Sequence, residues 1–277
     1  MEGAPVFLKR YGCNGQPEVA ARLLRELDGW VDALGLGGVN LFYHLAGKDY
    51  SCPLGQYLAC QVRKTPLVDG SGWKRRVEIT AVDLLPPLPA GSPALVVSVL
   101  DRFWLAQALQ QAGYVTLAGD AAFGLKLPLA VSLPTFTRLG YLAMPLLARL
   151  PLAYLYPLGP HQEHSRPRFQ HLYARARIIA GNWHFIRRNL PWHLNGQVFI
   201  TSGTTPADRE LLARRGASRL VTTTPTFQGI SPAANALEAV LVALGAGEEE
   251  YLHLARKLNW LPRMIELDPA STSSSGE

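Results

Sequence analysis

Acidic and basic side chains flank a glycine-rich turn in the segment "LVDGSGWKRR", where Asp69 precedes the turn and Lys74 follows it. A lysine whose pKa is lowered by burial can exchange a proton with a hydroxyl group, and a neighbouring carboxylate can assist the transfer. We therefore expect Lys74 and Asp69 to supply acid–base chemistry. An exposed, basic helix start is the alternative interpretation of these residues.

A second candidate segment, "AGNWHFIRRNLP", follows a predicted buried strand and contains His184, Arg187 and Arg188. Guanidinium groups bind carboxylates and phosphates through paired hydrogen bonds, and histidine titrates near neutral pH. The pattern predicts that Arg187 or Arg188 binds a substrate carboxylate and that His184 competes with Lys74 as the proton-transfer group. An aromatic cluster over the end of the sheet, with two solvated arginines, is the alternative.

Residues 94–120, "ALVVSVLDRFWLAQALQQAGYVTLAGD", are typical of a strand, a helix and a second strand that ends in an acidic residue. Asp120 follows the first loop by about 20 residues, the distance at which an acidic residue binds ribose in dinucleotide-binding domains. Ser98, Asp101 and Arg102 lie where such domains carry phosphate-binding glycines. We expect these four residues to contact NAD or NADP; the same architecture without a nucleotide is the alternative.

Three consecutive hydroxyl side chains, Thr222, Thr223 and Thr224, end another predicted buried strand in "RLVTTTPTFQGISPAAN". Ser231-Pro232 is predicted to begin the next helix, whose free N–H groups and dipole favour an anion. The segment therefore indicates anion or ribose binding by the threonines. Because β-branched threonine is also an ordinary strand residue, a purely structural role is the alternative.

The composition favours a globular protein that acts on anionic small molecules. The chain has 277 residues, of which 48% are hydrophobic and 17% charged, and its net charge is +6. The basic residues are scattered, so we expect a small anionic metabolite as partner and no nucleic acid. The three cysteines have no CxxC spacing and no secretion signal is visible, which predicts a cytoplasmic protein. A homo-oligomer stays an open alternative.

Two further segments have features of a metal site and of a membrane span, but their residues argue against both. The histidine-rich segment 161–171 matches no metal-binding spacing, so we expect no metal site. Residues 139–159 have the length of a membrane span but include Arg149 and three prolines. We interpret them as a core helix followed by an extended segment, without stable membrane insertion; contact with a membrane surface stays open.

Strand and helix patterns alternate after a Pro-rich linker at 85–93, which predicts a doubly wound, mostly parallel Rossmann-like α/β sheet. We place this domain at 86–262, with a helical insertion at about 121–176. Residues 1–85 form a smaller N-terminal α/β lobe, which begins with the strand "APVFLKRYG". Residues 263–277 are predicted to be a disordered tail. In such sheets, ligands bind at the carboxyl ends of the strands, where the strand order reverses.

The chain resembles the bacterial quinate 5-dehydrogenase-like family in segments that include "RELDGWVDALGLGGVNLF", "KTPLVDGSGWK", "VVSVLDRFWLAQAL" and "IIAGNWHFIRRNLP". Its C-terminal half is more loosely similar to the cofactor half of shikimate dehydrogenases. The first resemblance implies NAD(P)-linked oxidation of a ring hydroxyl in quinate or shikimate. The sequence departs from the shikimate dehydrogenase pattern, because the NVTxPxK-type lysine segment is absent and the GxGxxG loop is replaced.

Together these features predict an NAD- or NADP-dependent oxidoreductase that acts on a hydroxyl group of a small carboxylic acid. The missing glycines favour the alternative, a non-redox α/β protein that binds or senses an anionic metabolite.

Overall fold

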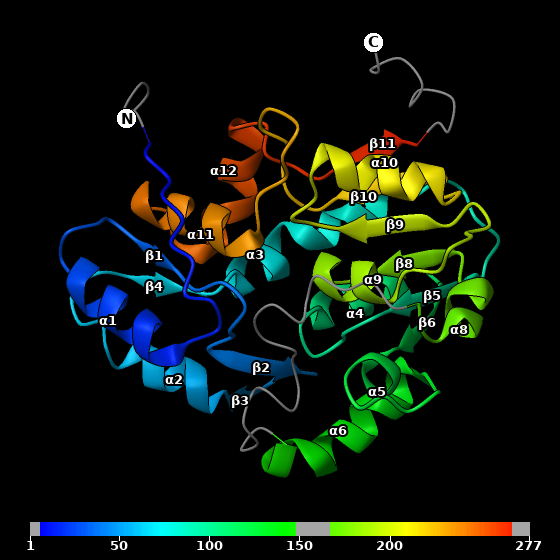
Figure 1. Cartoon of the computed structure of the whole chain (residues 1–277), viewed down its shortest axis with the longest axis horizontal. Helices are drawn as coiled ribbons and strands as arrows, with labels where there is room; N and C mark the ends of the chain where they lie inside the picture. Colours follow the sequence, from blue (N-terminus) through cyan, green and yellow to red (C-terminus); the bar gives the residue numbers. More distant parts are fainter. Residues whose placement is uncertain (1–5, 148–166, 268–277) are drawn as a thin grey trace.

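A seven-stranded, mostly parallel sheet forms the centre of the protein (Figure 1). The computed structural model describes residues 6–147 and 167–267. Across the sheet, the strands are β11 (Arg263–Glu266), β10 (Arg219–Thr222), β9 (Val198–Thr201), β8 (Ile178–Ala180), β5 (Pro93–Val96), β6 (Val115–Ala118) and β7 (Val131–Ser132). The five strands from β10 to β6 run parallel, and the outer strands β11 and β7 are antiparallel to their neighbours. The predicted mixed α/β architecture is confirmed.

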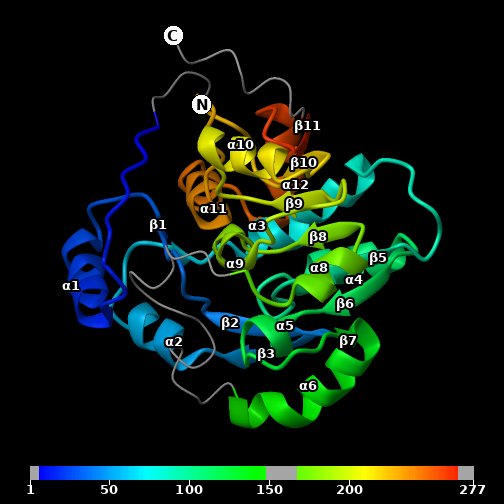
Figure 2. The same cartoon turned by 45° about the vertical axis from the view of Figure 1, so that its right-hand side comes forward.

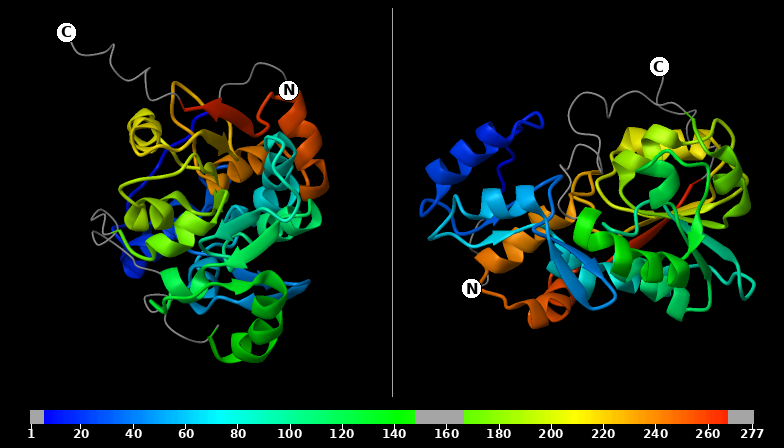
Figure 3. Two further views of the ribbon diagram at one scale, coloured as in Figure 1. Left: turned by 90° about the vertical axis from the view of Figure 1, so that its right-hand side faces the viewer. Right: turned by 90° about the horizontal axis from the view of Figure 1, so that it is seen from below.

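Helices cover both faces of this sheet, which explains why β8 and β9 are continuous apolar runs (Figure 3). On one face, α4 (Phe103–Gln111) and the 3₁₀ helix η1 (Glu78–Leu84) pack against alternate strand residues such as Val96 and Ile200. On the other face, residues such as Leu95 and Phe199 pack against the helices α8 (Gln170–Arg175), α9 (Trp183–Asn189) and α10 (Pro206–Arg214).

The N-terminal lobe has its own small core. Leu24, Leu34 and Leu58 pack together in that core. Its elements are α1 (Pro17–Leu27), α2 (Pro53–Ala59), the parallel pair β1 (Leu34–Gly35) and β4 (Leu67–Val68), and the hairpin of β2 (Phe42–Leu45) and β3 (Lys48–Ser51). The predicted strand at the start of the chain is wrong, because residues 6–12 have no regular secondary structure.

Chain segments far apart in sequence join the lobe to the sheet. The helix α3 (Ser71–Arg76) leaves the lobe and continues into η1. The helix α11 (Ala234–Ala243) returns from the end of β10 and packs against α3, β1 and β4 (Figure 2). The 3₁₀ helix η3 (Glu248–Glu250) and α12 (Tyr251–Lys257) complete this junction. The lobe is therefore held by the C-terminal part of the chain as well as by its own linker.

The insertion expected to be mostly helical contains α5 (Asp120–Phe123), α6 (Leu133–Leu147) and α8, with the short edge strand β7; residues 148–166 lie outside the described residues. One prediction for the sheet domain needs correction. The expected disordered tail begins with β11, which adds an antiparallel strand to β10. The four residues Arg263–Glu266 pair with β10, which orders this segment. Their short run of polar and apolar residues did not indicate a strand. Residues 268–277 are not described.

The segment 139–159 was expected to begin as a core helix, and in the described part this holds for one side of α6 only. Met144 is 1% exposed and belongs to the main hydrophobic core. The side chains of Leu139, Tyr141 and Leu142 on α6 are exposed, Leu142 to 83%. Among the described residues, no helix is long and apolar enough to cross a membrane.

The close approach of α3 to α11 predicts a strong effect of a methyl group at Gly70. Gly70 has φ +91°, and a Cβ there would lie 2.8 Å from the backbone N of Asn235, whereas Gly245 has φ +82° and open space around its Cα. Both Gly→Ala substitutions carry about 1–2 kcal/mol of backbone strain. We expect Gly70→Ala to lower the free energy of unfolding by about 1–3 kcal/mol more, measured by urea denaturation. Equal losses in both variants would contradict this packing.

Candidate functional site

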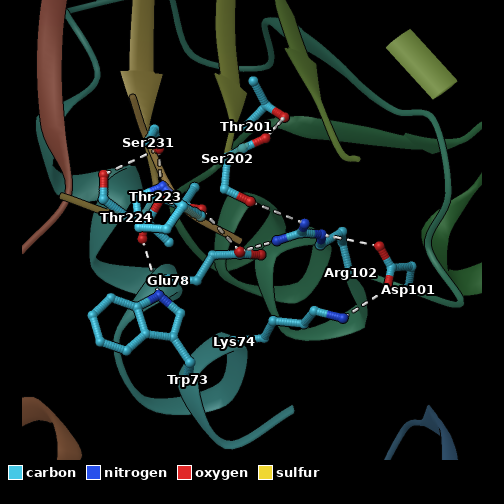
Figure 4. Close-up of polar contacts among 11 residues, drawn as sticks. Trp73, Lys74, Glu78, Asp101, Arg102, Thr201, Ser202, Thr223, Thr224 and Ser231 are labelled. Carbon is cyan, nitrogen blue, oxygen red and sulfur yellow. Dashed lines mark hydrogen bonds and ion pairs between the residues drawn. The ribbon is translucent and has the colours of Figure 1, made fainter. Parts of the chain in front are cut away.

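The predicted site loops meet where the strand order reverses. β6 lies on one side of β5, and β8, β9 and β10 follow on the other side. The loops after these parallel strands leave the same edge of the sheet, and α3 and η1 run past that edge. Figure 4 shows the polar side chains that these segments bring together.

Four buried charged residues form one continuous network at this edge. The ammonium group of Lys74 donates to Oδ1 of Asp101 at 2.7 Å, and Nε of Arg102 donates to Oδ2 of the same carboxylate at 3.1 Å. Nη1 of Arg102 forms an ion pair with Glu78. Figure 4 shows that Lys74 and Arg102 both point toward Asp101. Their side chains are at most 8% exposed, so solvent screens these pairs little.

Neutral groups from β9 and β10 complete the network. Thr223 donates its hydroxyl proton to Oε2 of Glu78 at 3.1 Å, and Nη2 of Arg102 donates to Oγ of Ser202 at 3.4 Å. The indole N–H of Trp73 donates to the carbonyl oxygen of Thr223 at 3.0 Å and fixes α3 against the end of β10. The network thus connects the junction helices to three strand ends.

The two cations and two carboxylates of the network balance each other, but their environments differ. Burial raises the pKa of Glu78, although Arg102 and Lys74 oppose the shift. Burial also acts to raise the pKa of Asp101, but Lys74 and Arg102 outweigh it and hold that pKa well below its usual value. Asp101 is therefore firmly ionised, and Glu78 is the carboxyl group that more readily takes up a proton.

Two polar groups of the network have spare hydrogen-bonding capacity. Within residues 6–147 and 167–267, Nζ of Lys74 bonds only to Asp101, although an ammonium group has three donors. Oε1 of Glu78 is fully buried and has no partner there. Buried polar atoms are normally satisfied, so unpaired ones mark a place where a ligand or water fits.

Asp120 closes the loop that was expected to bind a dinucleotide. Its two carboxylate oxygens accept the backbone N–H groups of Val99 at 2.7 Å and Leu100 at 3.1 Å. The N–H of Arg102 bonds to the carbonyl oxygens of Ser98 and Val99. Burial raises the pKa of Asp120 to about 6, against the effect of the two amides. The carboxylate expected to bind ribose therefore organises the loop instead.

The sequence suggested that Asp69 pairs with Lys74, but the two side chains do not pair in the structure. Its Oδ2 accepts the N–H of Leu41 at 2.6 Å and its Oδ1 accepts the N–H of Ser71 at 2.9 Å. These bonds hold the end of β4 and begin α3. Because backbone N–H groups occupy both carboxylate oxygens of Asp69, Lys74 pairs instead with Asp101 in the loop after β5.

The histidine and the arginines of α9 lie at the surface. His184 is exposed, and its backbone N–H is capped by the side chain of Asn182 at 3.0 Å. Arg187 is 54% exposed and lies 3.5 Å from Oδ1 of Asp208 on α10, and Arg188 is half-buried. This ion pair gives Arg187 a partner within the chain, and its contact with a substrate carboxylate stays a prediction.

Only Thr223, of the three threonines at the end of β10, joins the network. Thr222 donates to the carbonyl oxygen of Arg263 at 3.3 Å, and the hydroxyl groups of Thr224 and Ser231 lie 2.6 Å apart. Ser231-Pro232 does not begin a helix: α11 begins at Ala234. The helix thus begins two residues later than expected, and the anion or ribose binding expected of the threonines stays a prediction.

Sequence reasoning missed Glu78 and Ser202. Glu78 follows Lys74 by one helical turn, which places both on one side of the chain and was a usable signal. Ser202 had no comparable signal, because its contact with Arg102 joins residues 100 positions apart. Two surface cavities of about 400 and 220 Å³ are lined by other residues, so neither one is the site of the network.

Comparison with known families gives a match to the greater part of the chain. Residues 73–267 match the family model described as "Domain of unknown function (DUF8754)". The chain belongs to this family. Residues 1–69 match a second model, "Domain of unknown function (DUF8753)", so the two matches change over at the start of α3 and not at the linker 85–93. No curated protein and no solved structure matches the chain. All four charged residues of the network lie within the first match.

The buried network predicts a large effect of removing its central cation. Arg102→Met leaves two carboxylates with one ammonium group, so we expect a loss of about 3–5 kcal/mol in the free energy of unfolding. Arg214→Met is the control, because Arg214 is 58% exposed and pairs with Glu210 at 3.5 Å; its loss should be below about 1 kcal/mol. Urea denaturation measures both. Similar losses would show that the network contributes little.

Another buried carboxyl group, that of Glu238 on α11, faces the start of α3. Its Oε1 accepts the N–H of Gly72 at 3.2 Å, and its Oε2 has no partner among the described residues. Burial raises the pKa of Glu238 to about 7, and the nearby charges of Asp69 and Glu248 add to this shift. The phenol group of Tyr251 also lies in this environment.

This raised pKa predicts that stability falls as the pH rises. Between pH 4.5 and about 7, folded Glu238 keeps a proton that the unfolded chain has released. Protonation therefore favours the folded state below this window, and the contribution disappears above it; it amounts to about 3 kcal/mol at most. In Glu238→Gln, the fall in unfolding free energy over this window should be smaller by that amount. The exposed Glu250→Gln is the control, and parallel curves for wild type and Glu238→Gln would refute the assignment.

Proposed function

We propose that this protein binds a small anionic metabolite at the carboxyl edge of its sheet and is a non-redox α/β protein. The observation that carries the proposal is the buried ammonium group of Lys74, which uses one of its three donors within the described chain. A carboxylate or phosphate oxygen fits the remaining donors. Burial strengthens such a charged hydrogen bond because the local dielectric constant is low.

The position of Lys74 supports a ligand site. The strand order β7-β6-β5-β8-β9-β10 corresponds to the order of a Rossmann-like, doubly wound sheet, although β7 is antiparallel. Ligands of such sheets bind outside the carboxyl ends of the strands, where the order reverses. Lys74 and Asp101 lie at this position, between the loop after β5 and the junction helices.

The closed loop after β5 argues against a dinucleotide in its usual position. A pyrophosphate in this fold is bound by free N–H groups of the first loop. In this protein, the N–H groups of Val99, Leu100 and Arg102 are already bonded within the chain. A dinucleotide would have to displace the carboxylate of Asp120, which is an unfavourable exchange for two negatively charged groups.

The second candidate function is NAD- or NADP-dependent oxidation of a hydroxyl group in a small carboxylic acid. The Lys74–Asp101 pair favours it, since a lysine and a carboxylate in contact can pass on the hydroxyl proton. The cofactor would accept the hydride. The resemblance to quinate 5-dehydrogenase-like proteins points the same way.

Thermal-shift titrations distinguish the two candidates. The probes are quinate, shikimate and inorganic phosphate for the first, and the oxidised and reduced forms of NAD and NADP, with AMP, for the second. A ligand at about 100 times its Kd stabilises the folded state by about 2.7 kcal/mol, which is readily measured. The first candidate predicts a shift with an acid and none with a nicotinamide cofactor. A shift with NAD or NADP, and not with AMP, would overturn it in favour of the oxidoreductase.

A charge-matched double variant tests the role of Lys74 itself. Lys74→Met with Asp101→Asn removes one charge of each sign and leaves Arg102 paired with Glu78. We expect this variant to fold and to lose the ligand-induced shift. Lys9→Gln, a change in an exposed lysine of the N-terminal segment, should keep the shift. A double variant that keeps the shift in full would remove Lys74 from the binding site.

A further inference from the structure

A group of large apolar side chains lies exposed on α6 and on the loop that leads to it. In the loop, Leu125, Leu127 and Leu129 are 53%, 48% and 44% exposed. On α6, Leu139 and Leu142 are 55% and 83% exposed. Exposed apolar side chains that gather in one region of a protein often mark a surface that contacts a partner. We call these five leucines the α6 surface.

The loop and α6 occupy the same part of the molecule. Both lie at its lower edge in Figures 1 and 2, away from α10 and β11. The hydroxyl group of Tyr141 donates to the carbonyl oxygen of Ala46 at 2.9 Å and ties α6 to the turn of the β2–β3 hairpin. The α6 surface is therefore a fixed feature of the fold, since a buried anchor holds the helix: Met144 is 1% exposed.

Charge distinguishes this surface from an ordinary protein interface. Residues 121–147 contain no aspartate or glutamate, and their charged residues are Lys126 and Arg138. Both basic residues are exposed, and neither one forms an ion pair with a described residue. Exposed leucines next to basic residues, without an acidic residue among them, suit a surface that enters the boundary of an anionic lipid bilayer.

We propose that the α6 surface is a peripheral membrane-binding site for anionic lipid. The leucines enter the region between head groups and acyl chains, and Lys126 and Arg138 contact lipid phosphates. A single surface of this kind gives reversible binding and leaves the fold outside the hydrocarbon region. None of the five leucines and neither basic residue belongs to the network around Lys74, so binding to lipid does not require the metabolite site.

Vesicle co-sedimentation of the full chain tests the proposal. We expect the protein to sediment with phosphatidylcholine vesicles that contain phosphatidylglycerol and to stay in solution with phosphatidylcholine alone. Salt should weaken the binding, because it screens exposed charges. Leu142→Ser should lower the partition coefficient about tenfold through lost apolar burial, and Lys126→Gln about fivefold through lost charge. Each change is at an exposed position, so both variants should fold normally.

A matched control and two adverse outcomes complete the test. Trp30→Ser removes an aromatic side chain that is 85% exposed on the N-terminal lobe, and it should leave vesicle binding unchanged. Absence of sedimentation with both kinds of vesicle would overturn the proposal. If size-exclusion chromatography instead shows a dimer that Leu142→Ser dissociates, without vesicle binding, the α6 surface binds a second copy of the chain and the lipid assignment is wrong.

Discussion

The position of η1 against the sheet depends on the contacts that the buried guanidinium group of Arg102 makes. This group lies between Glu78 of η1 and Asp101 of its own loop, and it reaches Ser202 after β9. A buried cation without its partners would be strongly unfavourable, so the three segments must come together for any one of them to fold in place. The position of η1 fixes α3, and α3 in turn receives α11. The lobe and the sheet are thus joined by charge as well as by apolar packing.

Asp120 imposes the second constraint, which acts on the loop after β5. Its carboxylate bonds to the backbone N–H groups of a loop that lacks the glycines of a phosphate-binding loop. The two N–H groups are consecutive, and the carboxylate supports a tight turn without special backbone angles. The sequence pattern of strand, loop, helix, strand and acidic residue is therefore compatible with two different uses of the acidic residue. In one the carboxylate faces a ligand, and in this protein it faces the chain. Spacing alone does not distinguish these uses, since both place the carboxylate at the same strand end.

The sequence was informative where local chemistry decides the structure. Apolar runs bounded by turn residues predicted β5, β6, β8 and β10. Local chemistry also sets the start of α10, where Thr205 and Asp208 form both halves of a capping box. Long-range pairing was not predictable in this way. Lys74 pairs with Asp101 and not with Asp69, which is closer in sequence, because backbone N–H groups already bond to both carboxylate oxygens of Asp69. Strand β11 pairs with the free edge of β10, which its own residues do not indicate. The apolar residues of α6 likewise do not indicate which of them are covered by other parts of the chain.

The distribution of charge also separates two parts of the surface. The central network is neutral, with one cation for each carboxylate, and Arg75 and Arg76 at the junction pair with Glu248 and Glu249. The positive excess of the chain must therefore lie on residues outside these clusters. The region around α6 carries part of it without any carboxylate in its own sequence. An anionic lipid surface would be attracted to that region and not to the junction, because charge that is already paired contributes little field at a distance.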